Sequence, residues 1–382
     1  MTVKILKDIV AYRVLPGRVM LLLVCMLMLG ACASQQTNPA PPPLLNLGPP
    51  EQVADVDVLA MSPAMGEFLE RYILKYADLH TRQFLLMNAV TPNGVLGYDY
   101  DASLTLTAIE SFEKRTGNCI GFANMMIALA RGAGLKAEYQ EVLRRPEWSS
   151  HEDTVLLIKH INVLIYSPGY TYVVDVSGIR INPNMRRRII DDSHAKALYL
   201  NNIGAMALLE NDLPTAHAYL SSAIETEPLI TDPWVNLGVV FGRNEQLDDA
   251  AMALERALEI DTSEHSAMSN LYEVYIAQED LESAENLQAK VEKYRNSNPY
   301  YLLKLSDEAL AQANFDKSIK LLQRAIRKKK NDHQLHFALA KTQYLSGEIT
   351  EAEGSLERAR ELAPENMLTY YDQPLDVLIA EE

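Results

Sequence analysis

Three side chains in the first half of the sequence have the types and the order needed for nucleophilic chemistry at a carbonyl group. Cys119 begins the apolar, alanine-rich part of TGNCIGFANMMIALARGAGL, and this pattern, closed by two glycines, predicts a helix. His160 lies in TVLLIKHINVLIY and Asp175 in YTYVVDV, and both segments have the composition of strands. A thiolate attacks a carbonyl when a nearby base accepts its proton, and an imidazole oriented by a carboxylate is such a base. We therefore expect Cys119, His160 and Asp175 to form a catalytic site.

The position of Cys119 at the start of a helix favours a reactive thiol. The positive end of the helix dipole and the free backbone amides there favour the thiolate, and the same amides can hold an oxyanion. Gly117 allows a tight turn into the helix, Gly121 is expected to keep the space beside the thiol open, and Asn118 is a candidate substrate-binding residue. The alternative is a small buried cysteine without a chemical role, which is the commoner reason for a cysteine at such a position.

The sequence SPG between the two strands predicts a hairpin turn. His160 and Asp175 lie at nearly equal sequence distances from Ser167-Pro168, so the hairpin sets them close together on one face. A carboxylate within an apolar strand seldom lacks a partner, which favours a contact with the imidazole. His151 is a rival base in the polar segment PEWSSHED, which we expect to be a loop bordering the site, and Trp148 in that loop is a candidate cover for the cleft.

The segments GNCIGFANMMIALARGAGLKAEYQEV, KHINVLIY and YTYVVDVSG together resemble the transglutaminase-like superfamily in order and in spacing, with 41 residues from Cys119 to His160 and 15 from His160 to Asp175. The resemblance implies a papain-like core in which Cys119 is the nucleophile, His160 the general base and then the general acid, and Asp175 the orienting carboxylate. Many members have an aromatic residue shortly after the histidine and Pro-Thr after the aspartate. This sequence has Ile161-Asn162-Val163 and Val176-Ser177 there, a departure that concerns the type of substrate.

After about residue 196 the sequence repeats with a period of 34 residues. The segment WVNLGVVF, from Trp234 to Phe241, resembles a tetratricopeptide pattern with Phe in place of Tyr. Small residues recur on this grid, where the two helices of a hairpin cross closely: Gly204, Gly238, Ala216, Ala250, Ala284, Ser318, Ala352, Ala223, Ala257, Ala325 and Ala359. The resemblance is to five tetratricopeptide repeats that start at residues 197, 231, 265, 299 and 333, which implies an all-α superhelix with a concave binding groove.

The third repeat fits this pattern least well, because Tyr272 stands where glycine is usual and Gln288 where an apolar residue belongs. Three repeats have asparagine at the sixth position, where it could hydrogen-bond the backbone of an extended ligand: Asn202, Asn236 and Asn270. Asparagine is common at that position in these repeats, so a purely structural role is equally open. The tail is predicted to cap the last hairpin with four apolar residues: Leu368, Leu375, Val377 and Leu378.

The N-terminus predicts export. Basic residues precede the apolar run VMLLLVCMLMLGAC, whose 14 residues are short for a membrane span and typical of a secretory signal. Leu29-Gly30-Ala31-Cys32 resembles the lipobox of bacterial lipoproteins, which implies cleavage before Cys32, a lipid on Cys32 and an outer-membrane location facing the periplasm. An ordinary signal peptide and an uncleaved anchor are the alternatives. Cys119 is then the only thiol left, and a single thiol in an oxidising compartment is a candidate reactive one.

The predicted fold class is an α+β, papain-like transglutaminase core followed by an all-α tetratricopeptide-repeat superhelix. The expected parts are a signal peptide (1–31), a proline-rich extended tether (32–56), the transglutaminase-like domain (57–195), five repeats (196–366) and a C-terminal cap (367–382). Helices in the first domain are expected over Met65–Leu79, Ala102–Lys114 and Ile120–Arg131.

The charge and the motifs of the sequence argue against some classes of binding partner. The net charge of −16 argues against a nucleic-acid partner, because phosphates would repel the chain. Two basic runs, Arg186-Arg187-Arg188 and Lys328-Lys329-Lys330, are interpreted as solvated helix ends or loops. The eight histidines show no paired spacing and the sequence has no glycine-rich phosphate loop, so we expect neither a metal nor another cofactor.

Two functions follow from these observations. In the first, Cys119 attacks an amide carbonyl of a protein or peptide, and the acyl-enzyme is released by water (a cysteine peptidase or amidase) or by an amine (an acyl transfer). The repeats then deliver the substrate or dock the enzyme on a partner, and the lipid on Cys32 holds it at a membrane. In the second, the protein is a non-catalytic lipoprotein adaptor that uses its repeats for protein–protein interaction.

Overall fold

The computed structural model describes residues 40–45, 53–91, 93–151, 154–176 and 186–380. The expected signal peptide and Cys32 lie outside these residues. The chain divides into two compact units: the first comprises Met1–Arg145 and Lys159–Glu264, and the second Pro146–Ile158 and His265–Glu382. In the described part of the chain, no helix is both long enough and apolar enough to cross a bilayer.

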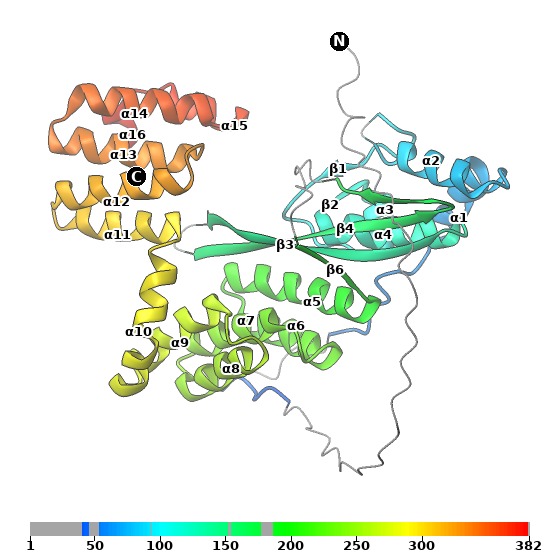
Figure 1. The fold of residues 1–382 in the computed structure, drawn as a ribbon, viewed down its shortest axis with the longest axis horizontal. Coiled ribbons are helices and arrows are strands. Elements are labelled where there is room, and N and C mark those ends of the chain that lie inside the picture. Colours follow the sequence, from blue (N-terminus) through cyan, green and yellow to red (C-terminus); the bar gives the residue numbers. More distant parts are fainter. Residues whose placement is uncertain (1–39, 46–52, 92, 152–153, 177–185, 381–382) are drawn as a thin grey trace, which may run out of the picture. The chain divides into compact units, whose positions relative to one another are not determined.

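The first unit begins with short helices that precede the predicted active-site helix (Figure 1). They are α1 (Pro63–Leu69), the π-helical turn η1 (Glu70–Leu74), α2 (Leu79–Ala89) and α3 (Ala108–Lys114). The helix expected over Met65–Leu79 therefore ends at Leu74. The helix expected from Ala102 begins only at Ala108, because Thr107 and Glu110 form a capping box that fixes its start.

Helix α4 (Cys119–Gly132) is the most deeply buried element of the first unit and confirms the helix predicted there. Its apolar residues pack in one core with the inner face of a sheet, represented by Tyr139, Val163 and Ile165. Asn124 is buried in this core and satisfied: its Oδ1 accepts from the Tyr139 hydroxyl at 2.7 Å, and its Nδ2 donates to the Leu106 carbonyl at 3.1 Å. The core therefore fixes α4 both to the sheet and to the segment before α3.

The main sheet has four strands in the order β5-β4-β3-β6. They are β3 (Lys136–His151), β4 (Thr154–Ser167), β5 (Tyr170–Val174) and β6 (Arg186–Ile190). A second, two-stranded sheet pairs β1 (Asp99–Tyr100) in parallel with β2 (Thr116–Gly117). The SPG turn is confirmed, with Gly169 in the left-handed region at φ 81° between β4 and β5.

Two sequence interpretations fail in this sheet. The segment PEWSSHED was expected to be a loop, but β3 continues to His151, because β4 starts at Thr154 and its first residues need a strand beside them. The run Arg186-Arg187-Arg188 was interpreted as a helix end or loop, but it begins the edge strand β6, which pairs antiparallel with β3. Arg188 there forms an ion pair with Glu141, a carboxylate almost completely buried in β3.

Paired helices follow the sheet. Those of the first unit are α5 (Asp192–Leu209), α6 (Leu213–Thr226), α7 (Thr231–Arg243) and α8 (Leu247–Ile260). The predicted boundary at residues 195/196 lies inside α5, whose Leu198 and Tyr199 share the core of α4. Ala40–Leu45, part of the expected tether, packs against these helices through His217 and Gln246.

The second unit continues the pairs with α9 (His265–Ala277), α10 (Leu281–Arg295), α11 (Pro299–Ala311), α12 (Phe315–Lys328), α13 (His333–Ser346) and α14 (Ile349–Leu362). Two short helices end it, α15 (Glu365–Tyr371) and α16 (Leu375–Ala380). Tyr371 and Leu375 pack on α13 and α14, whereas Leu368 and Val377, also expected to cap, are exposed.

The 34-residue period has a physical cause that the structure makes visible. A Cβ added at Gly204 would lie 2.7 Å from Leu220 Cγ, and one added at Gly238 would lie 2.5 Å from Leu254 Cγ. The two helices of the first and of the second hairpin therefore approach so closely that only glycine fits opposite the leucine. One residue in the loop of each hairpin has a positive φ, again at intervals of 34: Asn211, Glu245, Glu279, Ala313 and Gly347.

Candidate active site

Cys119 is the first residue of α4, and its side chain is half-buried. Asn118 caps the helix: its Oδ1 accepts from the Gly121 N–H at 3.1 Å, and its backbone carbonyl accepts from the Phe122 N–H at 2.9 Å. The first N–H groups of a helix have no partner within it. Of these groups, the Asn118 N–H donates to the Leu104 carbonyl at 2.8 Å and the Gly121 N–H donates to the Asn118 side chain, which leaves the N–H groups of Cys119 and Ile120 at the front of the helix, beside the thiol.

The two glycines that flank the cysteine have different roles. Gly117 has a φ of 149°, and a Cβ there would lie 2.7 Å from the Tyr98 hydroxyl, so the predicted tight turn needs glycine. Gly121 was expected to open the space beside the thiol. A Cβ at Gly121 would instead meet Ser111 Oγ at 3.0 Å and the Leu106 N at 3.3 Å, so this glycine allows α4 to pack closely against the α3 segment.

His160 is only 2% exposed, in the middle of β4, and its ring lies between an acid and the thiol. Its Nε2 hydrogen-bonds Asp175 Oδ2, and the Cys119 thiol lies near enough to the ring to contribute to its raised pKa. Since Nε2 is used by Asp175, Nδ1 is the nitrogen available to the thiol. The structure thus brings together the three residues that the sequence predicted to form the site.

The strand register explains how His160 reaches Asp175. Val163 pairs with Val174 in the β4–β5 hairpin, so Asp175, the first residue after β5, lies at the level of Asn162. His160 therefore contacts Asp175 diagonally rather than from directly opposite, a distance that a histidine side chain can span.

Electrostatics in the site favour a charged imidazole. Burial alone would lower the pKa of His160, but its hydrogen bonds and attraction to Asp175 and Cys119 outweigh burial and raise the pKa to about 9. Asp175 is shielded as well, with a side chain 15% exposed. The arrangement therefore suits an imidazole that takes a proton and remains paired with the Asp175 carboxylate.

Comparison with protein families agrees with this geometry. A model of the transglutaminase-like superfamily matches residues 86–175, the span that contains Cys119, His160 and Asp175. Models of the tetratricopeptide repeat match residues 231–264 and 303–366. The chain carries a transglutaminase-like domain followed by tetratricopeptide repeats.

No curated protein matches the whole sequence significantly. Among solved structures, a crystal structure of MamA protein is 16% identical and covers 47% of this chain and 97% of its own, with a TM-score of 0.28. MamA 41-end from Desulfovibrio magneticus RS-1 is 16% identical, with coverages of 44% and 94% and a TM-score of 0.29. YrrB, described as a TPR protein with an unusual peptide-binding site, is 15% identical, with coverages of 46% and 91% and a TM-score of 0.26. Likenesses this weak carry no argument about the site.

Two residues of the transglutaminase-like site were not predicted. Partial burial and the charges of Cys119 and Asp175 raise the pKa of Tyr100 to about 12, so this tyrosine, although 42% exposed, lies within electrostatic reach of both candidate residues. Asn162 follows His160 by two residues in β4 and is 1% exposed, and neither atom of its side-chain amide has a partner among the described residues. A buried amide without a partner beside an imidazole is a candidate contact for water or substrate. No sequence pattern singles out Tyr100, whereas Asn162 stands where an aromatic residue was expected.

The remaining predicted site residues are placed as follows. Asn118 is 5% exposed, and its amide is engaged within the protein, with Nδ2 donating to Thr105 Oγ1 at 2.8 Å. Trp148 and His151 belong to β3 by backbone, and their side chains lie outside the described residues. The three repeat asparagines are partly buried on the first helix of their hairpins: Asn202 on α5, Asn236 on α7 and Asn270 on α9. Asn236 Nδ2 donates to Asn201 Oδ1 at 2.9 Å, so part of the hydrogen-bonding capacity of the Asn236 amide is used within the repeats.

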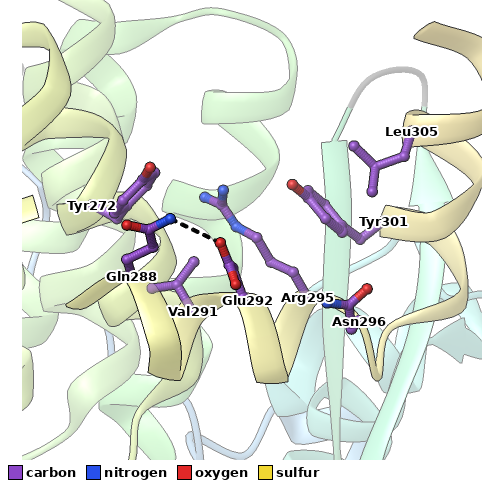
Figure 2. Close-up of a pocket in the computed structure, with 8 residues that line it drawn as sticks. All are labelled: Tyr272, Gln288, Val291, Glu292, Arg295, Asn296, Tyr301 and Leu305. Atoms are coloured by element: carbon purple, nitrogen blue, oxygen red, sulfur yellow. Dashed lines mark hydrogen bonds between the residues drawn. The ribbon is translucent and has the colours of Figure 1, made fainter. Parts of the chain in front are cut away.

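The irregular third repeat forms a pocket of about 290 Å³ between α9, α10 and α11, shown in Figure 2. Arg295 extends between two aromatic rings, with its guanidinium carbon 5.3 Å from the Tyr272 centroid and 5.2 Å from the Tyr301 centroid. Tyr272 and Gln288 stand at the positions filled by glycine and leucine in the first two repeats. A large ring in place of glycine prevents the close helix crossing, and the pocket lies where that contact is lost.

Proposed function

We propose that the transglutaminase-like domain is an acyl-transfer enzyme that acts on amide bonds of proteins or peptides through Cys119, His160 and Asp175. The observation that carries the proposal is the buried His160 ring held between a carboxylate and the only described thiol. Such an arrangement keeps the imidazole in one tautomer and orientation, as a base for a nucleophile requires.

The chemistry can be followed atom by atom. His160 accepts the thiol proton, Cys119 Sγ bonds to the carbonyl carbon, and the resulting oxyanion faces the N–H groups of Cys119 and Ile120. The carbon–nitrogen bond then breaks while His160 returns the proton to the leaving amine, which leaves a thioester on Cys119. Water releases this acyl group as a carboxylate, whereas an amine releases it as a new amide. The first outcome is a peptidase or amidase activity and the second a crosslinking activity.

The repeats and the N-terminus complete the proposal. Tetratricopeptide repeats are stacked hairpins that present extended surfaces to other proteins, so we assign them the binding of the substrate or of a partner assembly. We propose that a lipid on Cys32 holds the mature protein on the periplasmic face of an outer membrane. The lipobox-like sequence LGAC after a short apolar run supports this location.

Thiol alkylation tests the enzyme proposal without a known substrate. The rate of Cys119 modification by iodoacetamide would be followed by site-resolved mass spectrometry from pH 5 to 10, in the wild type and in His160→Ala. At pH 6 an ordinary thiol is less than about 1% ionised, so pairing with the imidazole should raise the wild-type rate at least about tenfold above that of the variant. His194→Ala, a histidine outside the site, serves as the matched control and should behave as the wild type.

An ordinary thiol titration that is the same in the wild type and in His160→Ala would refute the enzyme proposal. The repeats would then carry the function, and the protein would be the non-catalytic adaptor considered above.

A further inference from the structure

A short proline-rich segment of this chain lies on the first two repeats as a bound peptide would. Residues Ala40–Leu45 contain three consecutive prolines, and Leu44, which follows them directly, is only 7% exposed. The segment is about 200 residues away in sequence from the side chains that hold it, as the hydrogen bond from Leu45 to Gln246 shows. A segment that served only as a spacer would have no reason to bury an apolar side chain on the repeats.

The contacts are made to the backbone of the segment. Gln246 makes two hydrogen bonds to this backbone: its Nε2 donates to the Pro43 carbonyl at 3.2 Å, and its Oε1 accepts from the Leu45 N–H at 2.8 Å. His217 Nε2 donates to the Pro42 carbonyl at 2.7 Å, and Asn244 Nδ2 donates to the Leu45 carbonyl at 3.0 Å. Four polar groups of an extended chain are thus satisfied by three side chains.

The three side chains are held in place by their neighbours. The Gln246 amide also donates to Asp249 Oδ2 and accepts from Asn244 Nδ2, both at 2.6 Å. The His217 ring is 4% exposed and lies edge-on to Phe241, with 5.7 Å between ring centroids. Burial lowers the pKa of His217 more than its bond to Pro42 raises it, which favours the neutral ring with Nε2 as the donor.

Gln246 departs from the pattern of the repeats in a way that favours binding over stability. It is the N-cap residue of α8, and its side chain makes no cap bond. Asp212, Asp280 and Asn314 stand at the same position in three other repeats, and each side chain caps its helix, whereas Glu348 in the fifth repeat, like Gln246, makes no cap bond. A side-chain cap contributes about 1 kcal/mol. In the second repeat this contribution is absent, and the side chain faces the proline-rich segment instead.

The set of three side chains occurs once in the array. The equivalent positions of His217, at multiples of 34 residues, hold Ala251, Glu285, Ile319 and Glu353. The equivalent positions of Asn244 hold Glu210, Gln278, Gln312 and Ser346. None of these repeats combines an imidazole donor with two amides. The contact is therefore a local feature of the first two repeats and not a property of the repeat itself.

We propose that His217, Asn244 and Gln246 form a binding site for a proline-rich peptide, which the chain's own residues Ala40–Leu45 occupy. Proline fixes φ and has no N–H, so a proline run holds an extended conformation at little entropic cost and presents only carbonyls to donors. The site matches this chemistry, since it offers donors to the Pro42 and Pro43 carbonyls and one acceptor to the Leu45 N–H that follows the proline run. The proposal does not depend on catalysis by Cys119.

Hydrogen exchange in the full chain tests the occupancy. Prolines leave only Ala40, Leu44 and Leu45 of this segment with N–H groups, so a peptic fragment reports on few amides. Gln246→Asp supplies the cap residue used by other repeats and removes the two contacts. We expect at least tenfold faster exchange of the segment in this variant, with exchange of α8 no faster than in the wild type. Gln288→Asp, in the third repeat, is the control and should leave the segment as in the wild type.

Binding in trans tests the site. The probe is a fluorescein-labelled peptide with the sequence NPAPPPLLNL, followed by anisotropy. Leu44→Asp in the full chain should release the native segment and expose the site. A tethered segment competes at an effective concentration of about 1 mM, so this variant should bind the probe at least about tenfold more tightly than the wild type. The double variant Leu44→Asp with Gln246→Asp should not bind it.

The proposal is overturned if Gln246→Asp leaves exchange of the segment unchanged. It is equally overturned if Leu44→Asp binds the probe no better than the wild type, or if the double variant binds it as well as Leu44→Asp alone.

Discussion

Replacing Asp175 by asparagine isolates the electrostatic part of the proposed site. The side chain keeps its size and can still hydrogen-bond the ring, but the negative charge beside His160 is lost. A carboxylate in contact with an imidazole raises its pKa by about 1 to 3 pH units, equivalent to about 1.4 to 4 kcal/mol. Burial lowers the pKa of His160, and without the Asp175 charge less attraction remains to offset that effect. We therefore expect the titration midpoint of His160 to fall from about 9 by at least one pH unit.

The midpoint can be measured directly by NMR of ¹³C-labelled histidine. The chain has eight histidines, and the His160 resonance is assigned by its disappearance in His160→Gln. The exposed Asp99 of β1 provides a matched control, since Asp99→Asn removes one carboxylate without touching the hairpin that holds the ring. A wild-type midpoint near 6.5, or an equal midpoint in wild type and Asp175→Asn, would refute the charge-based reasoning.

The same pKa sets the sign of a stability effect. The folded-state pKa of His160 lies above the ordinary value of 6.5, so protonation stabilises the folded domain. This contribution is fully present below about pH 6.5 and is lost as the pH rises through about 9, and it amounts to about 3 kcal/mol. Native-state hydrogen exchange of β4 should show a smaller loss in Asp175→Asn than in the wild type, because the variant's His160 pKa lies closer to the ordinary value. If both proteins lost the same stability between pH 6.5 and 9, the pH dependence would not come from the His160–Asp175 pair.

Two further predictions concern the helices. Gly238→Ala should lower the free energy of unfolding of the repeats in urea by about 1 to 3 kcal/mol, because the added Cβ would lie 2.5 Å from Leu254 Cγ. Gly242→Ala on the same helix is the control: its Cβ would meet open space, so the substitution should be neutral or stabilising. Equal effects of the two substitutions would contradict the close-crossing account. Asn118→Ala should cost about 1 kcal/mol through the lost cap, and Asn118→Asp should recover that stability while slowing alkylation of Cys119 by adding a negative charge beside the thiol. A stable Asn118→Ala protein would argue that the cap matters little.

Local patterns predicted the elements that carry the candidate catalytic residues. The apolar segment after Cys119 became α4, and the two strand-like segments around SPG became the hairpin that joins His160 to Asp175. These features depend on neighbours in sequence, namely a helix start, a turn and an alternating strand. The repeats could also be predicted from the sequence, because small residues such as Ala216, Ala250 and Ala284 recur with a period of 34 residues.

Features that depend on distant contacts were missed. Tyr100 reaches the site through two-residue strands, whose parallel pairing has no sequence signature. The edge strand beginning at Arg186 carries three consecutive arginines, a composition that local rules assign to solvent. The proline run at Ala40–Leu45 has the composition of a spacer, and only the positions of His217 and Gln246, far along the chain, show that it is bound.

The start of α4 links the stability of the fold to its chemistry. A helix exposes four N–H groups at this end, and each must find a partner from outside the helix. The Asn118 N–H donates to the Leu104 carbonyl and the Asn118 side chain takes the N–H group of Gly121, which anchors the helix. The N–H groups of Cys119 and Ile120 are those that remain for the oxyanion of the proposed reaction. A stronger cap would leave fewer donors for the substrate, and a weaker one would let the first turn fray and move the thiol away from His160. The residue that opens the helix therefore has to satisfy both demands, and asparagine does so with one side-chain oxygen, without placing a charge beside the nucleophile.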